Sequence, residues 1–498
     1  MYVSSLLFLY ASESYESFIF HFQMCYNKAH NGFMPSIFQQ LKGLGEGLQW
    51  KVGISLDHQE KQTSSHEKEM TSPNSATRLI PSDWRRELLA GTVSFFAAVY
   101  IIIVNSSILA DAGIPQEAGI IATILASAIG CFIMGLWGNA PLVIVPGMGI
   151  NAMFTYTLVQ GMGLTWQQAL AAVMMSGICF FAISMTSLVE KLRTAIPASL
   201  QEAISVGIGL MLVLIGLHKG GVIASDRSSV IAVQSFADPG VLVTLATLAL
   251  TCILYIRKVP GNLLLAIIGG SALAYLFKAV PSKAATGVGG SSWSSYGDLF
   301  GQLSVKGASI TTLVIAVFSL TLVIVFENVG LINAQLKMSG RTERFKRVTQ
   351  ATSLTVILSG IFGTSPTVST VEAAAGISAG GRTGWASIAT GTLFLLSFIA
   401  MPVITLVPDQ AVAPILIFIG GLMMPAVRHI SFERMEEGLP AFFIIAFIPL
   451  MHSIVDGIAI GFISYALFHI AVGKWREVKP LFYIISLLFV MHFVLQTM

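Results

Sequence analysis

The stretch Gly135-Leu136-Trp137-Gly138-Asn139-Ala140-Pro141 recurs 225 positions later as Gly360-Ile361-Phe362-Gly363-Thr364-Ser365-Pro366. Each copy ends an apolar run long enough for a membrane helix, and each leads into a short segment rich in Gly, Ala or Thr. Interrupted apolar segments at matching places in two halves of a chain are the best sequence pointer to the binding site of a membrane transporter. The pattern therefore predicts an internal repeat built around such a site.

The composition indicates a membrane protein. Hydrophobic residues make up 54% of the 498 residues and charged residues only 11%, whereas a soluble domain has about 25% charged residues. The net charge of +3 comes without a basic face, so we expect no nucleic-acid partner. The four cysteines stand far apart without disulfide or metal-ligand spacing, and no HExxH motif occurs. We therefore expect no metal, no cofactor and no enzymatic activity.

Two sets of seven apolar runs follow Glu87, each long enough to cross about 30 Å of hydrocarbon. They lie near 87–111, 117–138, 141–161, 166–189, 196–217, 240–256 and 262–280, and near 310–336, 347–363, 366–381, 383–407, 411–427, 440–472 and 480–497. We therefore expect an all-α polytopic membrane protein with about 14 transmembrane spans. A repeat with an odd number of spans enters the membrane from opposite sides, so the two copies must be inverted. Spans 3 and 10 are expected to be broken helices that carry short strands.

The basic residues predict the orientation. If the spans alternate, most loops with Lys or Arg fall on one side, which is then the cytoplasm and also holds the N-terminus. These residues are Arg85, Arg86, Lys191, Arg193, Arg257, Lys258, Lys337 to Arg347, Arg382, Arg428 and Arg434. The loop with Lys474, Arg476 and Lys479 disagrees, but the run 440–472 before it is long enough to be kinked or re-entrant. Residues 1–86 read as a disordered tail, and we expect translation to start at Met70.

Two carboxylates lie deep in apolar runs. Glu327 stands ten residues before Lys337, and Glu372 stands ten residues before Arg382. At 1.5 Å per residue, each would lie about 15 Å from the cytoplasmic edge, near the bilayer midplane. An ionised carboxylate there costs at least about 2.5–3.5 kcal/mol, and two at one depth repel, so at least one is expected to carry a proton. The alternative is a pair of structural hydrogen-bonding acids.

The segments that follow the two prolines predict a short strand and then a half-helix. Backbone N–H groups freed there, and the positive end of a helix, attract a carbonyl or an anionic group. Asn151 adds an amide that both donates and accepts, which matches the edge of a heterocycle. The run Gly147 to Ala152 also fits a dinucleotide fingerprint, but no acid follows about 20 residues on. Gly149 is therefore expected to allow close approach of the broken segments.

Other ionisable residues are weaker candidates. His452 and Asp456 are i, i+4 neighbours in the run 440–472, so we expect them to pair structurally, with a proton relay as the alternative. Glu202, His218 and Asp409 stand near the ends of spans, where a solvated role suffices.

At these residues the chain resembles the nucleobase–cation symporter-2 family, in particular its hypoxanthine/guanine/adenine permease branch. The similarity covers about 87–497. The matching segments are Val145 to Ala152, Gly363 to Gly376, Ala379 to Gly384 and Asp456 to Tyr465.

The resemblance implies a core domain (87–189 and 310–407) that carries a purine base across by an elevator-like movement against a gate domain (196–280 and 411–497). It implies base-binding and proton-linked roles for Glu327 and Glu372, and a ring contact for Asn151. The branch commonly has Asp-Thr where Glu327 and Asn328 stand, Asn-Pro at Asn105 and Ser106, and an aromatic residue at Thr370. Because these changes lie beside the presumed pocket, they bear on which base is preferred, and Thr370 joins Gly149 among the expected substrate contacts.

The resulting hypothesis is a proton-coupled importer of purine bases in the cell membrane, with the lipid bilayer, the base and the proton as its partners. One alternative is an anion exchanger of the same inverted-repeat fold, although two midplane acids argue against it. A second is a non-transporting membrane receptor or scaffold, for which broken helices would be unnecessary. The choice of base, the stoichiometry and a homodimer stay open at this point.

Overall fold

The computed structural model describes residues 83–186, 189, 195–224, 232–279 and 292–497. The expected tail 1–86, with Met70, lies outside these residues except for its last four. Of those, Trp84 already begins helix α4, so helix starts earlier than the sequence predicts.

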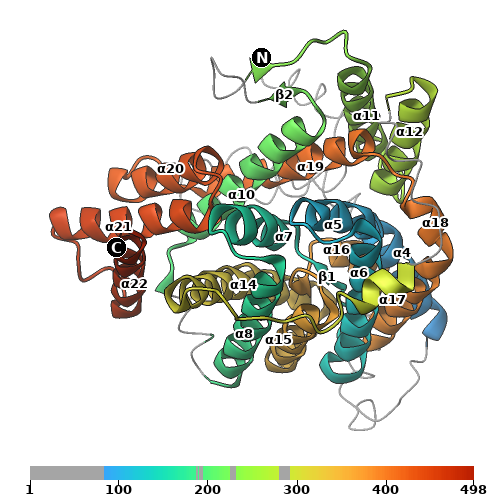
Figure 1. Ribbon diagram of the computed structural model, residues 1–498. Coiled ribbons are helices and arrows are strands. Elements are labelled where there is room, and N and C mark those ends of the chain that lie inside the picture. The colour runs from blue at the N-terminus through green and yellow to red at the C-terminus, as the bar shows by residue number, and fades with distance from the viewer. Residues whose placement is uncertain (1–82, 187–188, 190–194, 225–231, 280–291, 498) are drawn as a thin grey trace, which may run out of the picture. The chain divides into compact units, whose positions relative to one another are not determined.

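Helices dominate the described part (Figure 1), and nine helical stretches in it are long and apolar enough to cross a membrane. The first set of runs forms α4 (Trp84–Ala98), α5 (Tyr100–Asp111), α6 (Gln116–Ile133), α8 (Trp166–Met185), α10 (Ala198–Lys219), α11 (Pro239–Ile256) and α12 (Asn262–Leu276). The second forms α14 (Ile310–Ser339), α15 (Phe345–Phe362), α17 (Gly384–Leu396), α18 (Met401–Ile404), α19 (Asp409–Met423), α20 (Met435–Leu450), α21 (Ile454–Ala471) and α22 (Pro480–Thr497). The prediction of a multi-pass helical membrane protein is thereby confirmed.

Two short strands lie in the segments that follow the repeated motif. β1 (Ile144–Pro146) pairs antiparallel with β4 (Thr367–Ser369), with Val145 opposite Val368. β1 leads into α7 (Met148–Ala152) and the π-helix η2 (Met153–Gly161), and β4 leads into α16 (Ala373–Ser378). The pairing satisfies the backbone groups of segments that are not helical, which a membrane interior requires. The strand and the short helix expected in each half are therefore present, and the two halves meet through their strands.

The two copies of the motif end their helices at different positions. In the first, the π-helix η1 (Met134–Gly138) is followed by Asn139 in a left-handed conformation, with φ 46°. In the second, α15 ends at Phe362 and Gly363 is left-handed, with φ 84°. A π turn takes one residue more than an α turn, so the left-handed residue comes one position later in the first copy.

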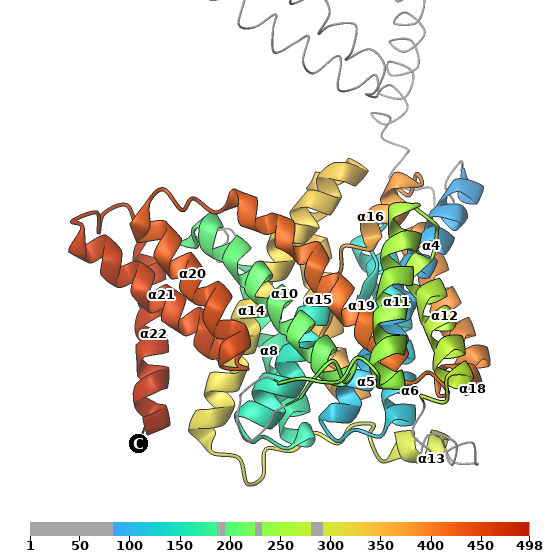
Figure 2. The same ribbon diagram turned by 90° about the horizontal axis from the view of Figure 1, so that it is seen from above.

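The helices pack as two groups (Figures 1 and 2). The first group contains α4 to α8 and α14 to α17, in which α15 packs on α8 and α17 on α4. The second contains α10 to α12 and α19 to α22, in which α10 packs along α19 and α20. In this group a Cβ on Gly209 would lie only 2.9 Å from the carbonyl oxygen of Gly420. Because both residues are glycines, α10 and α19 can come into close contact here.

The run 440–472 is two helices rather than the single span that the sequence predicts. α20 and α21 pack on each other after a turn at 451–453, in which His452 has φ 51°. Lys474, after α21, forms an ion pair with Glu436, in the first turn of α20. The basic loop that disagrees with the predicted orientation therefore returns to the end of the hairpin at which Arg434 stands, and the disagreement disappears.

The expected pair of His452 and Asp456 is also wrong. His452 lies in the left-handed turn before α21, whereas Asp456 lies inside that helix. Asp456 instead lies 3.0 Å from Nε2 of His492 on α22. Residues four positions apart face each other only within one helix, and here a turn separates His452 from α21.

Candidate functional site

Glu327 and Gly149 lie side by side. Glu327 projects from α14, and its Oε1 lies 3.8 Å from the position that a Cβ on Gly149 would occupy. Its Oε2 is buried without a hydrogen-bond partner in the described structure. The lack of a side chain at Gly149 leaves the backbone of α7 close to this carboxyl group.

Glu372 precedes α16, where it is the N-cap residue. Its Oε1 accepts a 2.6 Å hydrogen bond from the hydroxyl group of Tyr100, at the start of α5. Its Oε2 is buried and has no partner in the described residues. Neither Glu372 nor Glu327 forms an ion pair within the described ranges, so nothing there neutralises a charge on either group.

Asn151 and Thr370 complete the set of predicted polar side chains. Asn151 on α7 is fully buried, and both atoms of its amide lack partners among the described residues. Thr370 follows β4, is 8% exposed, and has an unpartnered Oγ1 there. Most buried polar groups in proteins are hydrogen-bonded. Each of the four predicted polar residues thus has polar capacity that a ligand with several donors and acceptors can satisfy.

Asn328 and Gln335 of α14 hold the end of β4, and neither was predicted to belong to the site. Oδ1 of Asn328 accepts a 3.1 Å bond from the backbone N–H of Ser369. Oε1 of Gln335 accepts from the Ser369 hydroxyl group at 2.6 Å, and its Nε2 donates to the carbonyl oxygen of Thr370 at 2.7 Å. These bonds place the residues after β4 against the helix that carries Glu327.

Asn105 on α5 holds the second copy of the repeated motif. Its Nδ2 donates to Thr364 at 2.9 Å and to Thr123 on α6 at 2.7 Å, and its Oδ1 accepts from Ser365 at 2.9 Å. All four side chains are buried. Asn105 therefore has a structural role in holding the turn before β4.

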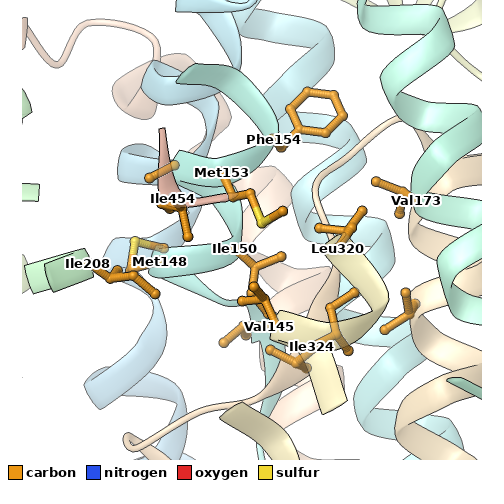
Figure 3. Close-up of a cluster of buried hydrophobic side chains, with 14 of the residues drawn as sticks. Val145, Met148, Ile150, Met153, Phe154, Val173, Ile208, Leu320, Ile324 and Ile454 are labelled. Carbon is orange, nitrogen blue, oxygen red and sulfur yellow. The ribbon is translucent and has the colours of Figure 1, made fainter. Parts of the chain in front are cut away.

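Apolar side chains surround the short helix α7 (Figure 3). Ile324 of α14 lies near Ile150, and Ile208 of α10 lies beside Met148 on the other side of α7. A Cβ on Gly149 would come 2.8 Å from Cγ2 of Ile208. Gly149 therefore stands where the first group of helices, through α7, meets the second group, through α10.

The predicted site residues come from segments that the fold brings together. Gly149 lies beside Glu327, and Thr370 and Glu372 follow the strand that pairs with the strand before Asn151. Tyr100 and Gln335 were not predicted from the sequence. Their partners, Glu372 and Ser369, stand 272 and 34 positions away, and no nearby residue indicates them. A polar residue in an apolar run was the only available signal, and many such residues bond only within their own helix.

Comparison with known proteins identifies similar chains. A family model described as "Permease family" (Xan_ur_permease) matches residues 85–460. The chain is 33% identical over 401 residues to the guanine/hypoxanthine permease PbuO of Bacillus subtilis, covering 77% of this chain and 91% of that protein. It is 31% identical over 389 residues to the adenine permease AdeP of Escherichia coli, covering 77% of this chain and 86% of that protein. The transmembrane domain of a cyanobacterium bicarbonate transporter, BicA, has a similar fold, with a TM-score of 0.58, 16% identity, and coverage of 74% of this chain and 96% of that one.

Proposed function

Because the chain belongs to this permease family, we propose that it imports purine nucleobases, namely hypoxanthine, guanine or adenine, by proton symport. The relatives named as guanine/hypoxanthine and adenine permeases support this class of substrate. The proposal rests above all on one observation. Asn151, Glu327, Thr370 and Glu372 each carry a buried polar atom without a partner in the described structure.

A purine base offers what these groups need. Its ring edge presents donors and acceptors in one plane, and an amide such as that of Asn151 can pair with either kind. Carboxyl groups accept from ring N–H groups when ionised and donate when protonated. The flat faces of the base fit an apolar lining, which Ile150 and Ile208 provide around α7. We therefore assign substrate binding to Asn151, Gly149, Glu327, Thr370 and Glu372, of which Gly149 contributes its backbone.

Proton coupling is assigned to Glu327 and Glu372. Purine bases are neutral, so an inward proton gradient drives their accumulation only if a protein group carries the proton with them. A carboxyl group without an ion-pair partner has no fixed positive charge beside it, so the bound base and the proton are the partners left to compensate it. Glu327 and Glu372 meet this condition within the described residues.

The movement that we propose is elevator-like. The core domain (87–189 and 310–407) carries the base past the gate domain (196–280 and 411–497), within a fold of about 14 spans in two inverted sets of seven, in which spans 3 and 10 are broken. The separate packing of the two helix groups supports this division, as does the meeting of Gly149 with Ile208 between them. We further propose that the protein lies in the cell membrane with a cytoplasmic N-terminus, and that a homodimer is compatible with this mechanism.

Two other functions are less well supported. The structural likeness to a bicarbonate transporter concerns the fold alone, and an anion would meet two carboxyl groups without a basic partner among the described residues. A receptor or scaffold has no use for several buried polar groups that lack partners in the described structure. Uptake distinguishes both from a purine permease.

The test is uptake of radiolabelled hypoxanthine, adenine and guanine into cells that lack their own purine transport, with and without a protonophore. We expect uptake of at least one base, and its collapse when the protonophore is added. No uptake of any base, with the protein present in the membrane, would refute the proposal.

Glu372→Gln tests the assigned group directly, because it removes the exchangeable proton and keeps the shape. We expect uptake to fall at least about tenfold, the equivalent of one charge-assisted hydrogen bond. Glu343→Gln is the matched control, since that carboxylate stands in the loop before α15 with a side chain that is 60% exposed. Wild-type uptake by Glu372→Gln would contradict the role.

A further inference from the structure

Tyr100 and Glu372 form the one hydrogen bond between described side chains that involves a predicted site carboxyl group. The Tyr100 hydroxyl donates to Oε1 at 2.6 Å, and its side chain is 1% exposed. The other oxygen, Oε2, is buried and has no hydrogen-bond partner among the described residues. We propose that Tyr100 is a positioning residue, which holds the carboxyl group so that Oε2, rather than Oε1, meets the purine and carries the exchanged proton. This inference rests on the proposed function and deepens it.

The two carboxyl oxygens of Glu372 differ because Tyr100 can donate a hydrogen bond to only one of them. A phenol has one proton to donate, and Tyr100 gives it to Oε1. The terminal torsion of a glutamate is soft, so an unheld carboxyl group would exchange its oxygens freely. Here such a rotation would break a buried hydrogen bond that water cannot replace. Oε2 is then the atom that accepts a proton, and it changes from hydrogen-bond acceptor to donor when it does so.

The surrounding contacts keep the two residues together. Gly376 of α16 packs so closely on Ser94 and Ala90 of α4 that any side chain on it would collide with them. Nearer the start of α4, Oε1 of Glu87 accepts hydrogen bonds from the backbone N–H groups of Arg382 and Thr383, at 3.0 and 3.1 Å. The first group of helices therefore holds α16 against α4, and the bond from Tyr100 to Glu372 is internal to that group. It is expected to persist while the second group moves.

Tyr100 lies inside a continuous helical stretch, Trp84–Asp111. α4 ends at Ala98 and α5 begins at Tyr100, and Val99 between them keeps a right-handed helical conformation, with φ −61° and ψ −28°. The Tyr100 side chain is 1% exposed, so the packing around it restricts its movement, as expected of a group that orients another.

Tyr100→Phe tests the proposal, because it removes the hydroxyl group and little else. The readouts are the KM and maximal rate of uptake of whichever base the wild type takes up fastest, with protein in the membrane measured in parallel. We expect the KM to rise about tenfold, with a smaller change in maximal rate. Tyr275→Phe is the matched control, since its hydroxyl group donates to the carbonyl oxygen of Leu406 at 2.7 Å, far from the site in sequence and exposed. It should leave both constants unchanged.

A double-mutant cycle separates positioning from a direct contact. If Tyr100 acts only through Glu372, Tyr100→Phe should add nothing to Glu372→Gln in a measurement of purine binding to the purified protein. An additional loss in that background, or a wild-type KM for Tyr100→Phe alone, overturns the proposal. Should Tyr100→Phe not reach the membrane, Glu372→Asp withdraws the carboxyl group from an unchanged tyrosine and must reproduce the rise in KM. A wild-type KM there also overturns it.

The outcomes distinguish this inference from the proposed function. If the wild type takes up no purine base, the proposed function fails, and the inference fails with it. If the wild type takes up a base and Tyr100→Phe equals the wild type, only the inference fails.

Discussion

The ammonium group of Lys219, near the end of α10, lies 2.9 Å from the carboxylate of Asp111, at the end of α5. It also lies 3.3 Å from Asp409, the first residue of α19, which in turn accepts a 2.9 Å hydrogen bond from Ser107 of α5. Tyr156 of η2 donates to Asp111 at 2.7 Å. One mostly buried cation thus ties α5 and η2, of the first group of helices, to α10 and α19, of the second.

Lys219→Met should slow transport without weakening substrate binding. The variant leaves Asp111 and Asp409 near each other without their shared cation, and the repulsion opens the contact between the two groups. We expect the maximal rate of purine uptake to fall about tenfold, the equivalent of about 1.4 kcal/mol, while KM changes little. Lys306→Met, which removes an exposed lysine, is the control. The double variant Lys219→Met/Asp111→Asn should recover part of the rate, and an unchanged rate in the single variant would rule out this coupling.

Asn151→Ala and Asn105→Ala should separate function from stability. Asn151 has no partner to lose in the described structure, so its removal should leave the thermal midpoint in detergent close to that of the wild type. Purine uptake should fall at least about tenfold because an amide contact to the ring is lost. Asn105→Ala leaves Thr123, Thr364 and Ser365 without their shared partner. We expect it to lower the free energy of unfolding by about 2 kcal/mol or more.

If Asn151 were a structural residue, its removal would lower stability as the removal of Asn105 does. A drop in the thermal midpoint for Asn151→Ala as large as that for Asn105→Ala, with uptake reduced only in proportion to the protein in the membrane, would contradict its assignment to the site.

The sequence predicted those features that depend on local pattern and on the internal repeat. β1 and β4 lie in the segments after Pro141 and Pro366, because a motif that stops a helix and then presents extended residues does so in both halves. In both halves the information is carried by residues close together in the chain.

Features that depend on packing between distant segments could not be predicted from the sequence. The turn between α20 and α21 contains no glycine and is flanked by apolar residues, so Met451 and His452 read as part of one long span. The bond from Tyr100 to Glu372 joins residues 272 positions apart. The π turn at η1 shifts the left-handed residue by one position, which no spacing of the motif reveals. These features require knowledge of which helix faces meet.

Gly149→Ala should impair transport through its contact with α10. The added methyl group would come 2.8 Å from Cγ2 of Ile208 and 3.8 Å from Oε1 of Glu327, so either α7 or α10 must shift. We expect uptake to fall about tenfold, since overpacking costs about 1–3 kcal/mol. Gly149→Ala/Ile208→Ala should restore much of it, because the smaller residue provides the space. Failure of that rescue would indicate that Gly149 acts through its backbone next to Glu327, and not through its contact with Ile208. Gly421→Ala, with nothing within 4 Å of the added Cβ, controls for the loss of a glycine outside the site.

The hairpin of α20 and α21 can be tested by crosslinking. Lys474 contacts Glu436 at the open end of the hairpin, and this hydrogen bond lowers the pKa of the Glu436 carboxyl group. The contact therefore holds at neutral pH, and on the acid side it is lost as the pH falls through that lowered pKa. In a chain whose four native cysteines are replaced, Glu436→Cys/Lys474→Cys should be joined by a short bis-methanethiosulfonate reagent. Glu437→Cys/Lys474→Cys, with its first cysteine turned by about 100° on the helix, should react more slowly. A membrane-impermeant maleimide should label both positions of the first pair from the same side of the membrane. Labelling of Glu436→Cys and Lys474→Cys from opposite sides would show that 440–472 crosses once, and would return the basic loop at Lys474 to the side that the single-span prediction assigns.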